Sequence, residues 1–63
     1  MFIYTFQDDE GHIPAFCETK IRDARIFAKS LLTLSSYESV KEILIYRADT
    51  KSKRYEVVEF VSR

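Results

Sequence analysis

The chain has 63 residues, of which 46% are hydrophobic, 14% aromatic and 32% charged. This composition is typical of a globular protein and excludes a disordered chain, which would be poor in aromatic and β-branched residues. Ten basic and ten acidic side chains cancel, whereas a dedicated nucleic-acid-binding domain carries a basic excess. We therefore expect one small domain, residues 1–63, that does not rely on its total charge for binding.

The cellular setting is predicted from the cysteine count and from the apolar runs. One cysteine, Cys17, excludes an intramolecular disulfide and a cysteine-rich zinc site. Small secreted domains usually contain several disulfides. The first ten residues lack a signal-peptide pattern, and the apolar run at residues 43–46 is far shorter than the roughly 20 residues that span a membrane. We expect a cytoplasmic protein with no membrane partner.

The first part of the chain predicts a strand at residues 2–6, since aromatic and β-branched residues dominate it. Its three aromatic residues share one face. Residues 8–11 form a polar turn in which Gly11 can adopt a positive φ. Residues 12–17 then either return as a second strand, confined to a sheet edge by Pro14, or form a loop.

A single helix is predicted at residues 19–34, with Thr19 as its N-cap. Its apolar residues recur at helical spacing and form one stripe: Ile21, Ala24, Phe27, Ala28, Leu31, Leu32 and Leu34. The opposite side carries three basic residues and one isoleucine. Ser35 and Ser36 are expected to end the helix because their hydroxyls compete for backbone hydrogen bonds, unless residues 37–41 extend the helical region by a turn.

Two further strands are predicted at residues 40–48 and 55–61, joined by a polar connection at residues 49–53. The alternation of the last strand places Tyr55, Val57 and Val61 on one face and Val58 and Phe60 on the other. The predicted fold class is α+β, a single helix on a three- or four-stranded, mainly antiparallel sheet. The order is β-β-α-β-β, or β-α-β-β if residues 12–17 form a loop.

No catalytic, cofactor or metal motif is present in the sequence. A single glycine excludes phosphate-binding loops. The acidic turn beside His12 lacks the alternating ligand spacing of a calcium loop and is interpreted as solvated. On an extended segment His12 and Cys17 point to opposite faces, so Cys17 is expected to be an inert packing residue. We expect no enzyme activity and no cofactor.

Basic residues give one alternative function, nucleic-acid binding through the helix and the last hairpin. Lysine and arginine contact phosphates, and neighbouring tyrosines can stack on bases. The candidates are Arg22, Arg25, Lys29, Arg47, Lys51, Lys53 and Arg54. The competing interpretation is an ordinary solvated helix face and a soluble hairpin tip.

The strands contain more apolar residues than one helix can cover, and this excess predicts an interaction surface. Whichever face meets the helix, large apolar side chains remain on the other. Exposed apolar patches and open sheet edges are both docking sites for proteins. The sequence thus favours a protein-interaction or regulatory module that binds a partner or forms a homodimer. The candidate anchors are aromatic: Tyr4, Tyr46, Tyr55 and Phe60.

Overall fold

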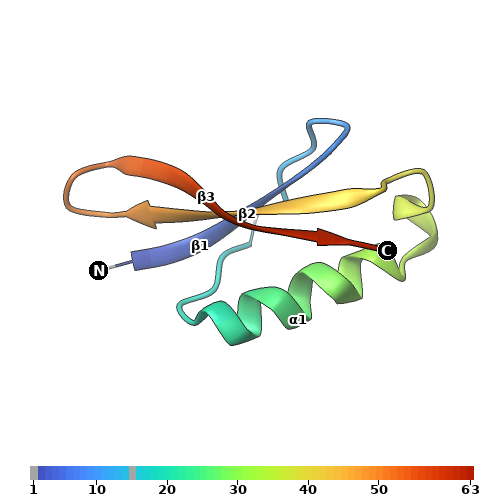
Figure 1. Cartoon of the computed structure of the whole chain (residues 1–63), viewed down its shortest axis with the longest axis horizontal. Helices are drawn as coiled ribbons and strands as arrows, with labels where there is room; N and C mark the ends of the chain where they lie inside the picture. Colours follow the sequence, from blue (N-terminus) through green and yellow to red (C-terminus); the bar gives the residue numbers. More distant parts are fainter. Residues whose placement is uncertain (1, 15) are drawn as a thin grey trace.

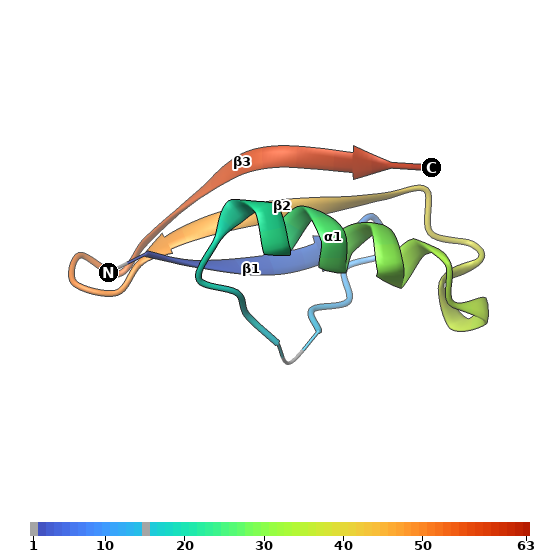
Figure 2. The ribbon, with the colours of Figure 1, turned by 90° about the horizontal axis from the view of Figure 1, so that it is seen from below.

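The computed structural model describes residues 2–14 and 16–63. It contains strand β1 (Phe2–Asp8), helix α1 (Ile21–Leu32), the short 3-10 helix η1 (Ser35–Tyr37), and strands β2 (Glu42–Asp49) and β3 (Arg54–Ser62) (Figure 1). The strands form one antiparallel sheet in the order β1-β2-β3. Helix α1 lies across one face of this sheet (Figure 2). The predicted α+β class with one helix on an antiparallel sheet is confirmed.

The predicted second strand is absent from the described part of residues 12–17, and Ala15 lies outside the described residues. The chain instead returns beside β1 and meets it at one bridge. There the Tyr4 N–H donates to the Glu18 carbonyl at 2.7 Å, and the Glu18 N–H donates to the Tyr4 carbonyl at 3.0 Å. Pro14 has no N–H to contribute to a longer ladder. The order along the chain is strand, helix, strand, strand.

Helix α1 is shorter than predicted at both ends. Its N-cap is Lys20, which makes no side-chain capping bond, so the prediction of Thr19 as N-cap is wrong. At the other end the Thr33 hydroxyl donates to the Ser30 carbonyl at 2.6 Å, and this local bond competes with continuation of the helix. Ser35 and Ser36 lie beyond, in η1. At 12 residues α1 is too short to cross a membrane, and the described chain has no longer helix.

The hydrophobic core lies between α1 and the sheet. Two fully buried alanines, Ala24 and Ala28, let the helix backbone approach the strands closely. Phe27 packs on the Phe6 ring with centroids 4.8 Å apart and stacks on Phe16 at 4.3 Å. The other buried members of this core are Leu31, Leu32, Val40, Ile43, Ile45 and Val61. We call the strand surface that meets α1 the covered face.

A β-bulge in β3 decides which of its side chains reach the core. Ile45 pairs with Glu59, but the next residue, Tyr46, pairs with Val57, so one residue of β3 has no partner. A bulge of this kind shifts the alternation of the strand. The predicted grouping of Tyr55 and Val57 with Val61 is therefore wrong, because only Val61 enters the core. The face away from α1 receives Tyr55, Val57 and Phe60, and the unpaired residue Val58 is exposed at the bulge.

Candidate interaction face

The sheet surface opposite α1, which we call the open face, is apolar and has no helix over it (Figure 2). Tyr55 is 68% exposed, Phe60 62%, Val57 39% and Val58 37%. By contrast, Ile45 on the covered face is 0% exposed. Cross-strand pairing assigns the apolar members of the open face: Ile3, Leu44, Tyr46, Ala48, Tyr55, Val57 and Phe60. Val58, the unpaired residue of the bulge, follows Val57 and is not part of the core under α1.

The centre of the open face carries no charged side chain. Of the strand residues that pairing places on this face, only Glu42 is charged, and it lies at the end of β2 opposite Ser62. The one polar pair near the centre satisfies itself, because the Tyr46 hydroxyl donates to Gln7 Oε1 at 3.0 Å. A partner can therefore cover this face without removing an ion from water, which would be costly.

Charged residues of β3 lie on the covered side instead, and they are paired there. Arg25 Nε of α1 lies 2.6 Å from Glu59 Oε2. This hydrogen bond and the charge of Arg25 hold the pKa of Glu59 below its usual value, and the same contact raises the pKa of Arg25. Glu56 forms an ion pair with Arg47. These pairs lie opposite the apolar surface and leave it uncharged.

A hollow of about 340 Å³ lies where the open face meets the segment that follows β1. Thr5, Gln7, Tyr46 and Tyr55 line it together with Ile13, which is 68% exposed. Ile13 thus extends the apolar surface beyond the edge of β1. Sequence reasoning missed this contribution, because neither a strand nor a loop at residues 12–17 predicts where the Ile13 side chain lies.

Three of the four predicted aromatic anchors lie together on the open face: Tyr46, Tyr55 and Phe60. The structure places Tyr4 elsewhere, since it shares the covered face with Phe6 and packs against the core. The bulge places Val57 on the same face as Phe60 and leaves Val58 exposed beside it, and sequence alternation alone does not reveal a bulge.

The seven basic candidates fall into two groups. Arg22, Arg25 and Lys29 lie on α1, whereas the other four lie at the β2–β3 hairpin end of the sheet (Figure 1). One member of each group is engaged by a carboxylate: Arg25 pairs with Glu59, and Arg47 pairs with Glu56 and lies 4.9 Å from the centre of the Phe2 ring.

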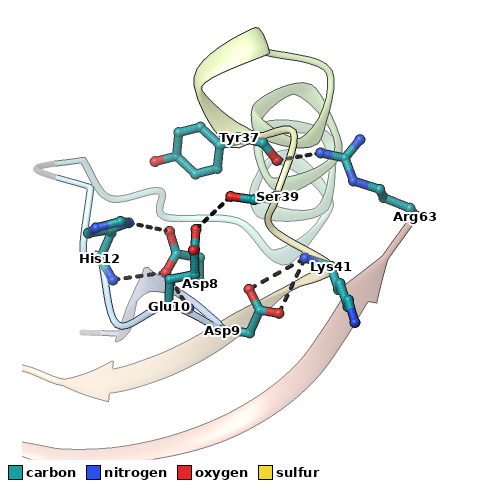
Figure 3. A network of polar contacts seen from close by, with 8 residues as sticks. All are labelled: Asp8, Asp9, Glu10, His12, Tyr37, Ser39, Lys41 and Arg63. Atoms are coloured by element: carbon teal, nitrogen blue, oxygen red, sulfur yellow. Dashed lines mark hydrogen bonds and ion pairs between the residues drawn. The ribbon is translucent and has the colours of Figure 1, made fainter.

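The acidic turn after β1 has a structural role (Figure 3). Asp8 is only 4% exposed, so the expectation of a solvated turn is wrong for this residue. Its Oδ1 accepts the N–H groups of Glu10 at 2.9 Å and His12 at 2.8 Å, and its Oδ2 lies 3.1 Å from His12 Nδ1. Burial alone raises the pKa of Asp8, but these hydrogen bonds outweigh it and lower the pKa below the usual value.

The rest of the turn fastens this end of the sheet to the segment before β2. The Ser39 hydroxyl donates to Glu10 Oε1 at 3.0 Å, and the Asp9 carboxylate accepts the Lys41 N–H at 3.3 Å (Figure 3). Gly11 has a φ of 89°, as the sequence predicted. Each acidic residue of the turn therefore holds backbone or a hydroxyl in place.

Cys17 is exposed, so the prediction that it packs as a small hydrophobic residue is wrong. It lies on the segment that returns outside β1, away from the core. Within residues 2–14 and 16–63, no group of three or more His, Cys, Asp or Glu side chains is arranged to hold a metal ion.

Comparison of the chain with protein-family models, curated proteins and solved structures finds no match in any of the three. The two faces of the sheet are therefore the basis on which a function is inferred.

Proposed function

We propose that this protein is a non-enzymatic interaction module that docks on protein through its open face. The observation that carries the proposal is the exposure of Tyr55 (68%) and Phe60 (62%) on one sheet face with an uncharged centre. Exposed apolar patches of several hundred Å² mark interaction sites. Aromatic residues are also enriched at such sites and supply much of their binding energy.

The sheet supports docking because it holds these side chains in place before a partner arrives. Tyr55, Val57 and Phe60 lie on a strand paired along its length with β2, and β2 is paired with β1. The Tyr46–Gln7 hydrogen bond fixes a fourth side chain of the same surface. A preorganised surface loses little conformational entropy on binding, so more of the apolar contact appears as affinity.

The test is capture of binding proteins from an extract of the native cell by three immobilised proteins, the wild type and two variants. Phe60→Lys places a charge on the open face, opposite Leu44. Ile26→Lys is the matched control, because Ile26 is 59% exposed but lies on α1. We expect proteins, or further copies of this chain, to be retained by the wild type and by Ile26→Lys and lost with Phe60→Lys. Equal retention by the wild type and both variants, or none by the wild type, contradicts the proposal.

Nucleic-acid contact through the β2–β3 hairpin is the second candidate. Lys51, Lys53 and Arg54 are exposed there, next to the exposed ring of Tyr55. The group is smaller than the sequence suggested, since Arg25 and Arg47 are held in ion pairs. Binding of this kind weakens steeply as salt rises. A titration of mixed DNA and RNA at low salt tests it, and an absence of retardation there removes the candidate.

A further inference from the structure

We propose that the partner of the open face is a second copy of this chain, packed face to face with its strands running in the opposite direction. The inference rests on the proposed function and names its occupant. In this arrangement the two-fold axis lies between the two sheets, parallel to their planes and perpendicular to the strands. The two helices lie on the outside, and the two open faces form a second core.

The uncharged centre of the open face limits the chemistry of its partner. A charged side chain placed against Val57, Val58 or Phe60 would be desolvated with no countercharge, because Glu42 at the strand end is the only charged strand residue on this face. The matching surface must therefore be apolar and uncharged. A second open face has these properties, and two-fold symmetry makes a surface its own partner.

The two ends of the sheet, the β2–β3 hairpin and the end where β2 begins, carry opposite charge. The hairpin end is basic: Lys51, Lys53 and Arg54 outnumber Asp49, and Arg47 and Glu56 neutralise each other in an ion pair. The other end holds the turn after β1 and the segment leading into β2, and it is acidic. There Asp8, Asp9, Glu10, Glu38 and Glu42 outnumber Lys41 and Arg63.

This charge distribution selects the direction of packing. An axis across the strands places the basic hairpin end of one copy against the acidic end of the other, at both ends of the dimer. An axis along the strands would bring the two hairpin ends together, and their like charges would repel. Such rim charges contribute more to orientation than to affinity.

The same axis gives the aromatic residues of β3 a partner. A rotation about an axis across the strands places β3 of one copy over β3 of the other. Val57 and Val58 lie between Tyr55 and Phe60 in β3, so an axis at this point brings Tyr55 of one copy towards Phe60 of the other. Aromatic pairs of this kind are favoured beyond the area that they bury.

The size of the open face predicts a weak dimer. A fully buried aromatic side chain covers about 150–250 Å², and Tyr55 and Phe60 each expose roughly two thirds of theirs. With the two valines and the partly exposed residues of β1 and β2, each copy offers on the order of 500 Å². The total of about 1,000 Å² is at the lower limit for a specific interface. We therefore expect a weak, transient dimer.

A dimer formed by pairing the β3 edges of two copies is less consistent with the structure than face-to-face packing. The bulge in β3 disturbs the ladder at that edge, and bulges are a usual means of blocking edge pairing. Such pairing would also leave both open faces exposed to water. The other edge, along β1, is partly occupied by the Tyr4–Glu18 bridge.

Sedimentation velocity over a concentration series tests whether the dimer forms. The wild type and Ile26→Lys should pass from the 7.5 kDa monomer to twice that mass, whereas Phe60→Lys should raise the dissociation constant at least tenfold. Circular dichroism checks that each variant is folded. A wild type that stays monomeric to millimolar concentration overturns the inference. If its capture of another protein still depends on Phe60, the proposed function survives; if it captures nothing, both fail.

Cross-linking tests the direction of packing in a Cys17→Ser background, using a short bismaleimide. Mixed Tyr55→Cys and Phe60→Cys chains should cross-link to each other more than Tyr55→Cys chains cross-link to Ile3→Cys chains. An axis along the strands would place β3 over β1 and reverse this order, and the reversed result would overturn the proposed direction.

Discussion

The covered face and the open face are built from the same three strands and the same kinds of residue, yet the strand residues packed under α1 and the aromatic residues of β3 on the other face differ sharply in exposure. Phe6, Ile43 and Ile45 are at most 1% exposed, whereas Tyr55 and Phe60 are 68% and 62% exposed. The difference comes from α1, whose buried Ala24 and Ala28 bring it close to one side only. An apolar strand surface therefore marks where contact is favourable. The covered face has this contact from α1, and the open face has no layer packed against it.

The largest expected effect is on the covered face. Phe6→Ala removes a fully buried ring and should cost about 3–5 kcal/mol of the free energy of unfolding, enough to unfold much of so small a domain. Phe60→Ala should change this quantity little at low protein concentration, where the second copy is absent. It should lower the midpoint more as concentration rises, because a dimer is stabilised by mass action.

Denaturation with urea at several protein concentrations measures both substitutions. An equal loss of unfolding free energy for Phe6→Ala and Phe60→Ala at the lowest protein concentration would contradict the difference in burial between the two faces. A Phe60→Ala effect that is independent of concentration would argue against self-association.

The next effect concerns the turn that fastens the sheet to the segment before β2. Asp8→Ala leaves the N–H groups of Glu10 and His12 without their acceptor and should cost about 2 kcal/mol. Asp9→Ala is the neighbouring comparison: it removes only the long, exposed bond from the Lys41 N–H at 3.3 Å, so it should cost less than Asp8→Ala, no more than about 1 kcal/mol. Thermal denaturation compares them. A larger loss for Asp9→Ala would contradict the structural role of Asp8.

Acid should act on the folded domain without acting directly on the open face. The pKa values of Asp8, Asp49 and Glu59 are lowered in the folded state. Asp8 is lowered by its hydrogen bonds, Asp49 by the Lys51 N–H, and Glu59 by Arg25. A lowered folded pKa means that the unfolded chain takes up protons first, so the stability from these groups is present at neutral pH. It is lost as pH falls from about 4 through the folded pKa values.

The free energy of unfolding between pH 7 and pH 3 measures this loss, and Asp8→Asn should reduce its slope. A slope that is unchanged in Asp8→Asn would show that this carboxyl does not contribute. Stability that rises towards pH 3 would contradict the sign of all three shifts.

The smallest effect is at the hairpin that joins the two strands carrying most of the open face. Lys53 has a φ of 57°, a conformation that costs a non-glycine residue roughly 1 kcal/mol. Lys53→Gly should raise stability by up to about that amount. Lys51→Gly removes the same charge two residues away and should not raise it. Urea denaturation distinguishes them, and equal gains would indicate a charge effect.

Sequence patterns predicted the elements of this fold better than their faces. The helix stripe from Ile21 to Leu32 and the apolar run at residues 43–46 are strong periodic signals, and both became elements in the expected places. The bulge at Val57–Val58 was not predictable, because it depends on pairing with β2 and leaves no mark in the alternation. Because of the bulge, most apolar residues of β3 lie on one side of the sheet, whereas strict alternation would divide them between the two faces.

The other differences between prediction and structure concern single residues whose surroundings form only when the chain folds. Asp8 looked like part of a solvated acidic run, but two backbone N–H groups and a histidine surround it only once the turn has formed. Thr19 had the composition of a cap, but the helix begins at Ile21 after Lys20. Of the candidate site, the excess of apolar strand residues was visible in the sequence, whereas the separation of Tyr4 from Tyr46, Tyr55 and Phe60 required the sheet register.

The most direct test is the accessibility of individual methyl groups to a soluble paramagnetic chelate, followed by NMR as protein concentration rises. The methyl groups of Val57 and Val58 report on the open face, and that of Ile26, exposed on α1, is the internal control. We predict that the relaxation enhancement caused by the chelate falls for the methyl groups of the two valines as protein concentration rises, while that of the Ile26 methyl group stays constant. Valines that remain as accessible as Ile26 at every concentration would contradict the claim that a second copy covers this face.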